Sequence, residues 1–197
     1  MIDYEREFQQ SMAAAETLLE KTEDPRHRAI LNNYRRHVHL EVCGRIDDIL
    51  APDMTVPHPV YRICWAGRTR VLDGPDQVRS FYNELGGAGA VLWNTDEEIA
   101  VADWGFAAEL TLNQLMPGHA LAAEGEDIDD PRATYHLKSR QAFVWPYSDG
   151  ALLIGEHIYE DLSTREIVKP DPATVVSPER AIELVQPRLA ELAGPAT

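Results

Sequence analysis

The chain has 197 residues, of which 44% are hydrophobic and 26% charged, a composition typical of one soluble globular domain with a substantial core. Its 18 basic and 33 acidic residues give a net charge of −15, and so negative a surface repels phosphate groups, which excludes nucleic acid and anionic membranes as preferred partners. The sequence has no apolar run long enough to span a membrane and no signal-peptide pattern, and Cys43 and Cys64 form neither a metal-binding spacing nor a disulfide framework, so we expect a cytoplasmic protein with reduced thiols.

Helices are predicted over the first 50 residues. Apolar residues at steps of three and four after Asp3 indicate one amphipathic helix, with the stripe Tyr4, Phe8, Met12, Ala15 and Leu19. Asp24-Pro25 is typical of an N-cap followed by proline at the first helical position, and it starts a helix that runs to about Cys43. The residues expected on the inward face of this helix are Ile30, Leu31, Tyr34, Val38 and Val42. A short helical segment with Ile46, Ile49 and Leu50 precedes Pro52.

From Met54 onward the hydrophobic period falls to two, which predicts a strand. If the strand is unbroken as far as Cys64, His58 lies on its apolar face between Val56 and Val60. The prolines at positions 57 and 59 fall on the opposite face and cannot donate ladder hydrogen bonds, so they place this strand at an edge or a bulge.

The rest of the chain reads as one helix, three long strand regions and a final helix. Gly74-Pro75 starts a helix that carries Val78, Phe81, Tyr82 and Leu85, and residues 86–89 form a glycine-rich loop. Strand regions are predicted at about 90–115, 134–147 and 151–161, with a bulge at Gly105 and a hairpin turn over residues 148–150. Residues 117–133 are interpreted as a solvated lid, 167–176 as a linker, and Ser177-Pro178 as the start of a helix kinked by Pro187.

The first candidate chemical group combines Tyr34, His37 and Glu41, which are neighbours on a helix at spacings of three and four. A buried tyrosine hydroxyl can donate to a developing oxyanion, and a histidine exchanges protons near neutral pH. The alternative is a core tyrosine with a satisfied hydroxyl and a boundary His37 that pairs with Glu41. On a strand His37, His39 and Glu41 would share one side and could bind a metal, but on a helix the two histidines point about 200° apart, so we expect no metal and a solvated His39.

His58 is the second candidate, because it interrupts an apolar face and a buried imidazole costs free energy unless it is bonded. A neutral, desolvated histidine is a competent general base. The alternative is a core histidine that is bonded to a backbone carbonyl.

Further along the chain, Glu109 and Arg140 lie among apolar strand residues, where they could orient a substrate, pair with each other or face solvent. One of Glu156 and His157 faces the interior, and alternation alone leaves open which one. The side chains predicted to contact a substrate are Tyr61, Phe81, Tyr82, Trp104, Glu109, Arg140 and His157. No glycine-rich phosphate loop, dinucleotide fingerprint, nucleophile elbow or His-Glu-x-x-His motif is present, and we expect no cofactor.

The order of elements over residues 25–161 resembles the SnoaL-like branch of the nuclear-transport-factor-2-like superfamily. Locally the resemblance rests on Leu31-Asn32-Asn33-Tyr34, Asp47-Asp48-Ile49-Leu50-Ala51-Pro52, the helix from Gly74-Pro75 to Leu85, and Gly155-Glu156-His157-Ile158-Tyr159-Glu160-Asp161. It implies an α+β fold in which three helices close a curled mixed sheet into a conical barrel with an internal pocket, commonly as a homodimer or higher homo-oligomer. The family domain would span residues 25–165, after a helical extension over 1–24 and before a linker and C-terminal helix over 166–197.

The resemblance also implies a function. Several members of the superfamily place a tyrosine of the first core helix and an acid or base of the first strand against the ligand, and Tyr34 and His58 occupy matching places. His58 stands where isomerases carry a carboxylate, and no Asp–Arg–Asp set of epoxide hydrolases is present. We therefore expect a cofactor-free lyase, or secondly an isomerase, that acts on a hydrophobic oxygenated aromatic or polycyclic molecule. His58 would be the base, Tyr34 the oxyanion or leaving-group donor, and His37 a second acid or an orienting group. The alternative is a non-catalytic ligand-binding or assembly module of the same fold.

Overall fold

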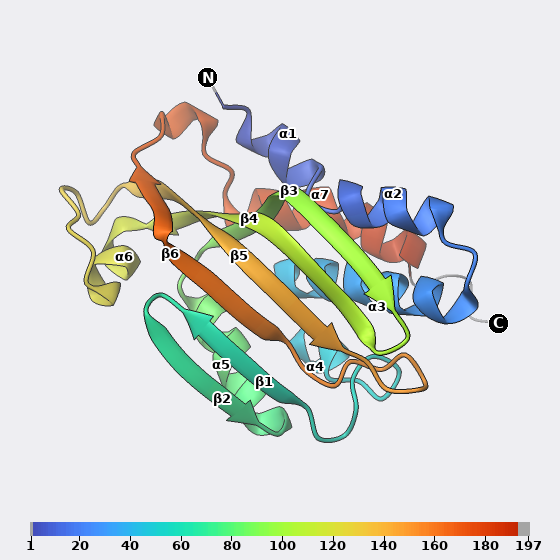
Figure 1. Ribbon diagram of the computed structural model, residues 1–197. Helices are drawn as coiled ribbons and strands as arrows, with labels where there is room; N and C mark the ends of the chain where they lie inside the picture. Colours follow the sequence, from blue (N-terminus) through green and yellow to red (C-terminus); the bar gives the residue numbers. More distant parts are fainter. Residues whose placement is uncertain (1, 193–197) are drawn as a thin grey trace.

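The structure is a computed structural model that describes residues 2–192. Met1 and residues 193–197, which belong to the predicted terminal segments 1–24 and 166–197, lie outside the described residues. Helices precede the strands of a single six-stranded sheet, lie between some of them and follow the last one (Figure 1). The α-helices are α1 Tyr4–Gln9, α2 Ala13–Lys21, α3 Pro25–Val42, α4 Ile46–Ile49, α5 Pro75–Gly87, α6 Gly118–Glu124 and α7 Pro178–Leu192. The strands are β1 Val60–Trp65, β2 Arg68–Asp73, β3 Val91–Ala102, β4 Gly105–Pro117, β5 Thr134–Pro146 and β6 His157–Val168, and a 3-10 helix covers Pro172–Thr174.

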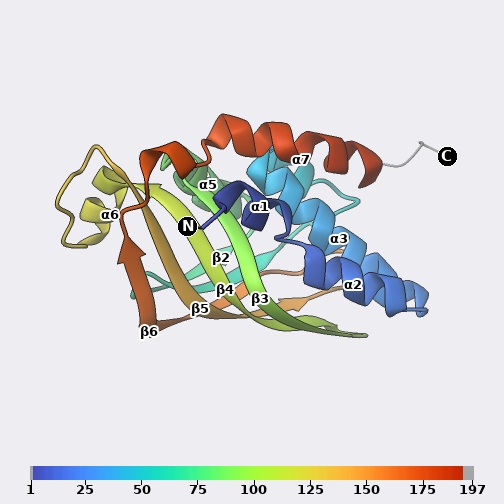
Figure 2. The same cartoon turned by 90° about the horizontal axis from the view of Figure 1, so that it is seen from above.

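The sheet has the strand order β2-β1-β6-β5-β4-β3, with β1 parallel to β6 and the other neighbours antiparallel. It is a mixed sheet that curls, and α1, α2, α3 and α7 gather on one face of it (Figure 2). The main core lies between this face and the helices and includes Tyr34, Phe106, Leu110 and Trp145. The α+β class, the curled mixed sheet and the covering helices that the sequence predicts are confirmed. No helix among the described residues is long and apolar enough to cross a membrane.

The helix boundaries follow the local signals. The carboxylate of Asp24 accepts hydrogen bonds from the backbone N–H groups of Arg26 and His27 at 2.8 and 3.0 Å, so α3 begins at Pro25 as predicted. The single helix predicted after Asp3 is instead two, α1 and α2, separated by a turn over residues 10–12. Its apolar stripe is nevertheless buried along both pieces, because the turn keeps the two helices against the same surface.

Two strand predictions are wrong for local backbone reasons. The first strand begins at Val60 and not at Met54, because the proline-containing stretch before it leaves the ladder. The region 90–115 is a hairpin of β3 and β4 that turns at residues 103–104, and Gly105 opens β4 where a bulge was predicted. The true bulge lies in β3 between Thr95 and Glu98, where Asp96 has φ of 51°.

The alternation predicted along β5 is confirmed, since its odd-numbered residues from Tyr135 to Trp145 are all buried. The strand predicted at 151–161 instead spans residues 157–168 and so includes the start of the predicted linker.

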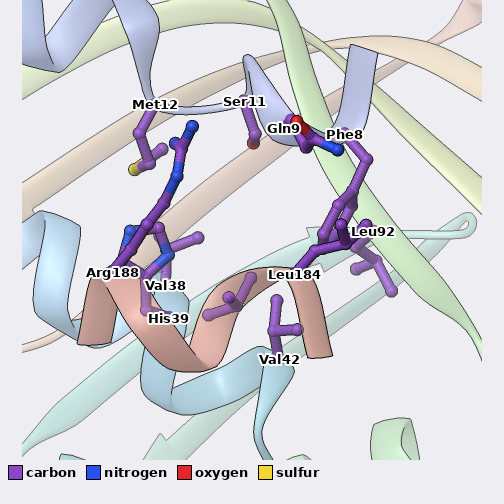
Figure 3. Close-up of a pocket in the computed structure, with 11 residues that line it drawn as sticks. Phe8, Gln9, Ser11, Met12, Val38, His39, Val42, Leu92, Leu184 and Arg188 are labelled. Carbon is purple, nitrogen blue, oxygen red and sulfur yellow. The ribbon is translucent and has the colours of Figure 1, made fainter. Parts of the chain in front are cut away.

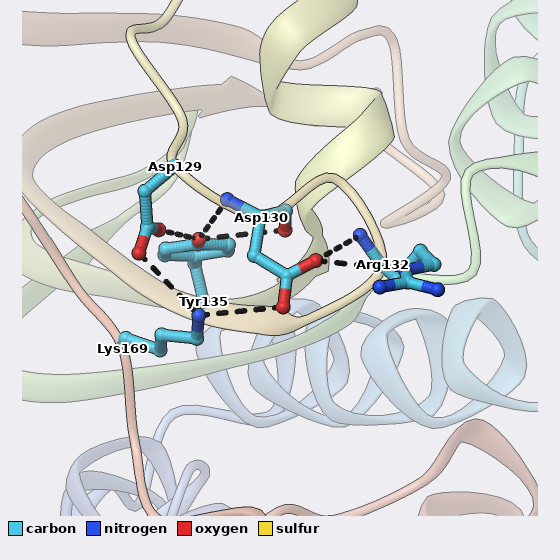
Figure 4. Close-up of polar contacts among 5 residues, drawn as sticks. All are labelled: Asp129, Asp130, Arg132, Tyr135 and Lys169. Carbon is cyan, nitrogen blue, oxygen red and sulfur yellow. Dashed lines mark hydrogen bonds and ion pairs between the residues drawn. The ribbon is translucent and has the colours of Figure 1, made fainter.

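Residues 117–133, predicted to be a loop, contain α6. The segment after α6 is held by Tyr135, whose hydroxyl bonds Asp129 and accepts the backbone N–H of Asp130 at 3.0 Å, and by Lys169, 3.5 Å from each aspartate (Figure 4).

Candidate active site

A cavity of about 410 Å³ lies between α3, α5, the inner face of the sheet and the first turn of α7. Most of its wall is apolar, and the wall reaches the surface at the end of α5, where Asn83, Gly86 and Gly87 are exposed. This volume is in the range of small-molecule sites in proteins. The polar or ionisable side chains on the wall are Ser11, Glu41, Cys43, Tyr82, Asn83, Asn94, Gln141 and Glu156.

Glu156, immediately before β6, is the centre of a buried polar cluster on this wall, with 3% of the residue exposed. Its Oε1 accepts a hydrogen bond from the Tyr82 hydroxyl and lies 2.9 Å from Nε2 of His37. That Nε2 is also 2.8 Å from the Tyr82 hydroxyl. The Tyr82 hydroxyl thus links the Glu156 carboxyl to the His37 ring.

The tyrosines of the cluster remain protonated. The Tyr61 hydroxyl lies 3.4 Å from that of Tyr82, on the side away from the cavity wall. Burial, and secondly the negative charge of Glu156, raise the pKa of both phenols well above its ordinary value. Each phenol is therefore a hydrogen-bond donor over the whole physiological pH range.

Glu41 lies one helical turn after His37 on α3, and its half-buried side chain forms part of the cavity wall. Burial, and secondly the charge of Glu156, raise the pKa of its carboxyl to about 7, against the opposing effect of His37. A carboxyl with this pKa exists in both protonation states near neutral pH, which is the property required of a group that takes up and returns a proton.

Tyr34 belongs to a second buried network, behind the wall. Its side chain is fully buried, and its hydroxyl donates to Oε1 of Glu97 at 2.8 Å and accepts from the Asn94 amide at 3.1 Å. Asn94 reaches the cavity, whereas Tyr34 and Glu97 do not. Burial raises the pKa of Glu97 to about 7, although the hydrogen bond from Tyr34 lowers it.

Three comparisons place the fold among known proteins. No protein-family model matches the sequence, and no curated protein sequence matches it. Among solved structures, a computationally designed 17-OHP binder superposes with a TM-score of 0.50 at 14% identity, over 71% of this chain and 98% of the binder. The protein has the SnoaL-like, nuclear-transport-factor-2-like fold.

Two natural proteins give similar values. The epoxide hydrolase/cyclase-like enzyme SalBIII, described in pyran ring formation in the polyether salinomycin, has a TM-score of 0.48 at 16% identity and covers 78% of this chain and 98% of its own. A protein assigned as a polyketide cyclase from Xanthomonas campestris pv. campestris has a TM-score of 0.49 at 16% identity and covers 70% of this chain and 94% of its own. At these identities the resemblance concerns the fold alone.

Within this SnoaL-like fold, the predicted inward position of His58 is wrong. Its side chain is 68% exposed, and its Nε2 pairs with Asp73 at 2.7 Å at the surface. The prediction relied on unbroken strand alternation from Met54, and that alternation ends because the prolines on either side of His58 interrupt the ladder before β1. A histidine with this exposure is solvated and does not serve as a desolvated base.

The predicted substrate-contacting residues divide between the cavity wall and positions outside it. Phe81 and Tyr82 line the cavity, as expected, and Tyr61 contacts Tyr82 without lining it. Trp104 is 49% exposed in the β3–β4 turn, so its predicted place in the pocket is wrong. Three other predicted residues do not line this cavity: Glu109, Arg140 and His157.

The open alternatives for these strand residues are decided by the sheet. The Arg140 guanidinium contacts Glu109 at 2.5 Å across β4 and β5, so these two pair with each other on the outer face. Of the neighbours Glu156 and His157, Glu156 faces the cavity. The segment 117–133 contributes no side chain to the wall, so it is no lid of this cavity.

His39 also differs from expectation, since it is buried and not solvated. It lies beside Arg188 in a separate pocket of about 20 Å³ between α3 and α7 (Figure 3). Burial lowers its pKa to about 4, and the charges of Arg188 and Arg35 act in the same direction. His39 was predicted to be solvated because the sequence of α3 does not show that α7 packs against this side of the helix.

Three polar residues of the site were not singled out as functional from the sequence: Glu97, Asn94 and Gln141. Gln141 carried a signal, because it interrupts an apolar alternation that proved to be the inner face. Glu97 carried no such signal, because no pattern in the sequence indicates the bulge in β3 that turns its side chain inward.

Proposed function

We propose that this protein is a cofactor-independent acid–base enzyme, a lyase or an isomerase, that acts on an apolar oxygenated small molecule in the cavity. Glu41 is the group that transfers the proton. The observation that carries the proposal is a carboxyl with a pKa of about 7 on the wall of a largely apolar cavity, next to the buried Glu156–Tyr82–His37 cluster.

The chemistry follows from the state of Glu41. As a carboxylate in a poorly solvated cavity, it removes a proton from a carbon next to a carbonyl group. The electron pair of the C–H bond forms a C=C double bond while the π pair of the carbonyl group moves onto its oxygen, which gives an enolate. The resulting carboxylic acid returns the proton. Its return to a different carbon gives an isomer of the substrate, and its return to a leaving hydroxyl group releases water and completes an elimination.

The other polar groups hold this arrangement in place. The hydrogen bond from the Tyr82 hydroxyl and the contact with Nε2 of His37 keep the Glu156 carboxyl fixed beside Glu41. Tyr34 does not line the cavity. We assign it a positioning role through Asn94, because the Tyr34 hydroxyl accepts a hydrogen bond from the side-chain amide of Asn94. The computationally designed 17-OHP binder supports the use of this fold for a small-molecule ligand.

The test is turnover of a compound panel by chelator-treated protein, followed by mass spectrometry. The panel contains hydroxylated aromatics, steroids, polyketide-like polycycles and diaryl diols. We expect loss of water, or an isomer of unchanged mass, from at least one class. The rate should depend on an ionisation near pH 7, because the carboxylate form of Glu41 is the base.

Two glutamine variants test the assignment of the proton-transfer group. Glu41→Gln should lower turnover by roughly 10²–10⁴, whereas Glu98→Gln, which changes an exposed carboxyl on β3, should not. Full activity of Glu41→Gln would remove Glu41 from the mechanism. Binding of panel compounds without any product would favour the non-catalytic ligand-binding module.

A further inference from the structure

We infer that the ligand of this cavity carries a protonated amine on an aromatic or polycyclic body. The inference rests on the cavity of the proposed function and adds the charge and chemical class of what it binds. Three features of the described residues carry it: the charges on the wall, its free hydrogen-bonding atoms, and its aromatic rings.

The ionisable side chains on the wall are unbalanced. Glu41 and Glu156 both contribute carboxyl groups, and among the described residues no lysine, arginine or histidine lines the cavity. The nearest basic group, His37, contacts Glu156 from outside the wall. An anionic ligand would face two carboxyl groups at low dielectric without a compensating cation, whereas a cation supplies the missing charge.

The wall carries free hydrogen-bonding atoms of both kinds. Gln141 is 2% exposed and its Oε1, an acceptor, has no hydrogen-bond partner, and the buried Nε1 of Trp145, a donor, has none either. The pKa of Glu41 reflects burial and two neighbouring charges without a contribution from any hydrogen bond to a described residue. A buried acceptor without a donor costs free energy, so the ligand that stabilises Gln141 and Glu41 presents N–H or O–H groups to them. An ammonium group supplies such donors.

The remaining wall is rich in aromatic rings. A cation over such a ring is attracted by its π electrons, and flat apolar ligands pack well against the same surfaces. The net charge of −15 also attracts cations toward the protein. The aromatic side chains that line the cavity are Trp65, Phe81, Tyr82, Trp93, Phe143 and Trp145.

A cation in this cavity would change the protonation of Glu41. Burial and the charge of Glu156 keep Glu41 partly protonated near neutral pH, and a positive ligand opposes both effects, so binding expels a proton. An amine substrate would thereby convert Glu41 into the base that the proposed reaction needs. The other titratable groups that surround Glu41 from α3, α5, β1 and the segment before β6 are His37, Cys43, Tyr61, Tyr82 and Glu156.

Matched ligands test the inference by calorimetry. For naphthalene, biphenyl and phenanthrene bodies, the aminomethyl, hydroxymethyl and carboxylate forms are compared at pH 7 in two buffers of different ionisation enthalpy. We expect the amine of at least one body to bind at least tenfold more tightly than its alcohol, and the carboxylate not to bind. Amine binding should release roughly half a proton, since Glu41 is then about half protonated.

The variants separate charge from shape. Glu41→Gln should weaken amine binding at least tenfold, abolish proton release and weaken alcohol binding less than amine binding, while Glu98→Gln should bind like the wild type. An alcohol or carboxylate that binds as tightly as its amine would overturn the inference, and so would failure of all nine compounds to bind. Calorimetry measures binding alone. If the alcohols bind more tightly than the amines, this inference fails and the proposed acid–base reaction still stands. If the amines bind but the activity assay shows no turnover of amine substrates, the proposed reaction is contradicted and this inference stands.

Discussion

Glu41 and Glu97 are two buried carboxyls that share a pKa of about 7 but differ in their surroundings. Glu41 faces the cavity, where a ligand or solvent can reach it. Glu97 has a buried Oε2 without a partner, and its other oxygen accepts from Tyr34. The same shift in pKa thus has two consequences: at Glu41 it prepares proton transfer, and at Glu97 it couples folding to pH.

The free energy of unfolding should therefore depend on pH through Glu97. Its folded pKa of about 7 lies above its ordinary value of 4.5, so between these pH values the folded protein holds a proton that the unfolded chain has lost. This stabilisation is complete below about pH 4.5 and is lost as the pH rises through 7. Glu97→Gln, which stays neutral, should gain roughly 1–3 kcal/mol over the wild type between pH 5 and 8.

Urea unfolding at a series of pH values measures this difference. Glu98→Gln changes the exposed neighbouring residue and should run parallel to the wild type. Parallel curves for Glu97→Gln and the wild type would show that Glu97 has an ordinary pKa in the folded protein.

Tyr82 should contribute to stability through its hydroxyl. The substitution Tyr82→Phe leaves the buried Glu156 and His37 with one hydrogen-bond partner fewer, so we expect a loss of about 1–3 kcal/mol in the free energy of unfolding. Tyr159 is 43% exposed, and Tyr159→Phe is a matched control that should change stability by less than about 0.5 kcal/mol. Thermal unfolding compares the two variants, and equal stability would contradict the buried cluster.

At the scale of elements, the β3–β4 hairpin determines which polar residues reach the interior. The bulge between Thr95 and Glu98 breaks the alternation of β3, so that Asn94 and Glu97 both enter the buried network. At the other end of the hairpin, Gly105 has φ of 142°, and a Cβ there would overlap the carbonyl oxygen of Trp145 on β5. The hairpin can pair closely with β5 only because residue 105 has no side chain.

Gly105→Ala should therefore destabilise the protein by roughly 2–4 kcal/mol, because both the backbone angle and the contact with β5 are unfavourable for alanine. At Gly86, within α5, an added Cβ would meet no atom within 4 Å and the helical backbone suits alanine, so Gly86→Ala should be neutral or slightly stabilising. Chemical denaturation measures both changes. A neutral Gly105→Ala would mean that β4 and β5 are further apart than the structure shows.

At the scale of the whole molecule, the net charge of −15 opposes the compact state through self-repulsion. Salt screens this repulsion, and it also weakens surface ion pairs, but each exposed pair contributes only about 0–1 kcal/mol. We expect the thermal midpoint to rise between about 20 and 500 mM salt, over which the Debye length falls from more than about 20 Å to about 4 Å. NaCl and KCl should act alike in a thermal scan, and a fall in the midpoint would show that ion pairs dominate.

Much of the fold could be predicted from local pattern. Asp24-Pro25 marks the start of α3, and the alternation along β5 identifies its buried face, because each signal depends on residues only a few positions apart. The same reasoning failed at His58, where extrapolating an alternation across two prolines placed an exposed side chain inside. It also missed Glu97, which reaches the interior through a bulge.

The class of the fold, the start of α3 and the placement of Tyr34 on its inner side follow from the amino-acid sequence alone. The composition of the site depends on how the whole chain packs. Glu41 and Glu156 are far apart along the chain. They become neighbours because α3, which carries Glu41, packs across the concave face of the sheet, and Glu156 lies there immediately before β6. The periodicity of a segment reports which of its faces is buried, whereas the dielectric environment and the charge next to a carboxyl depend on what the rest of the chain brings to that face.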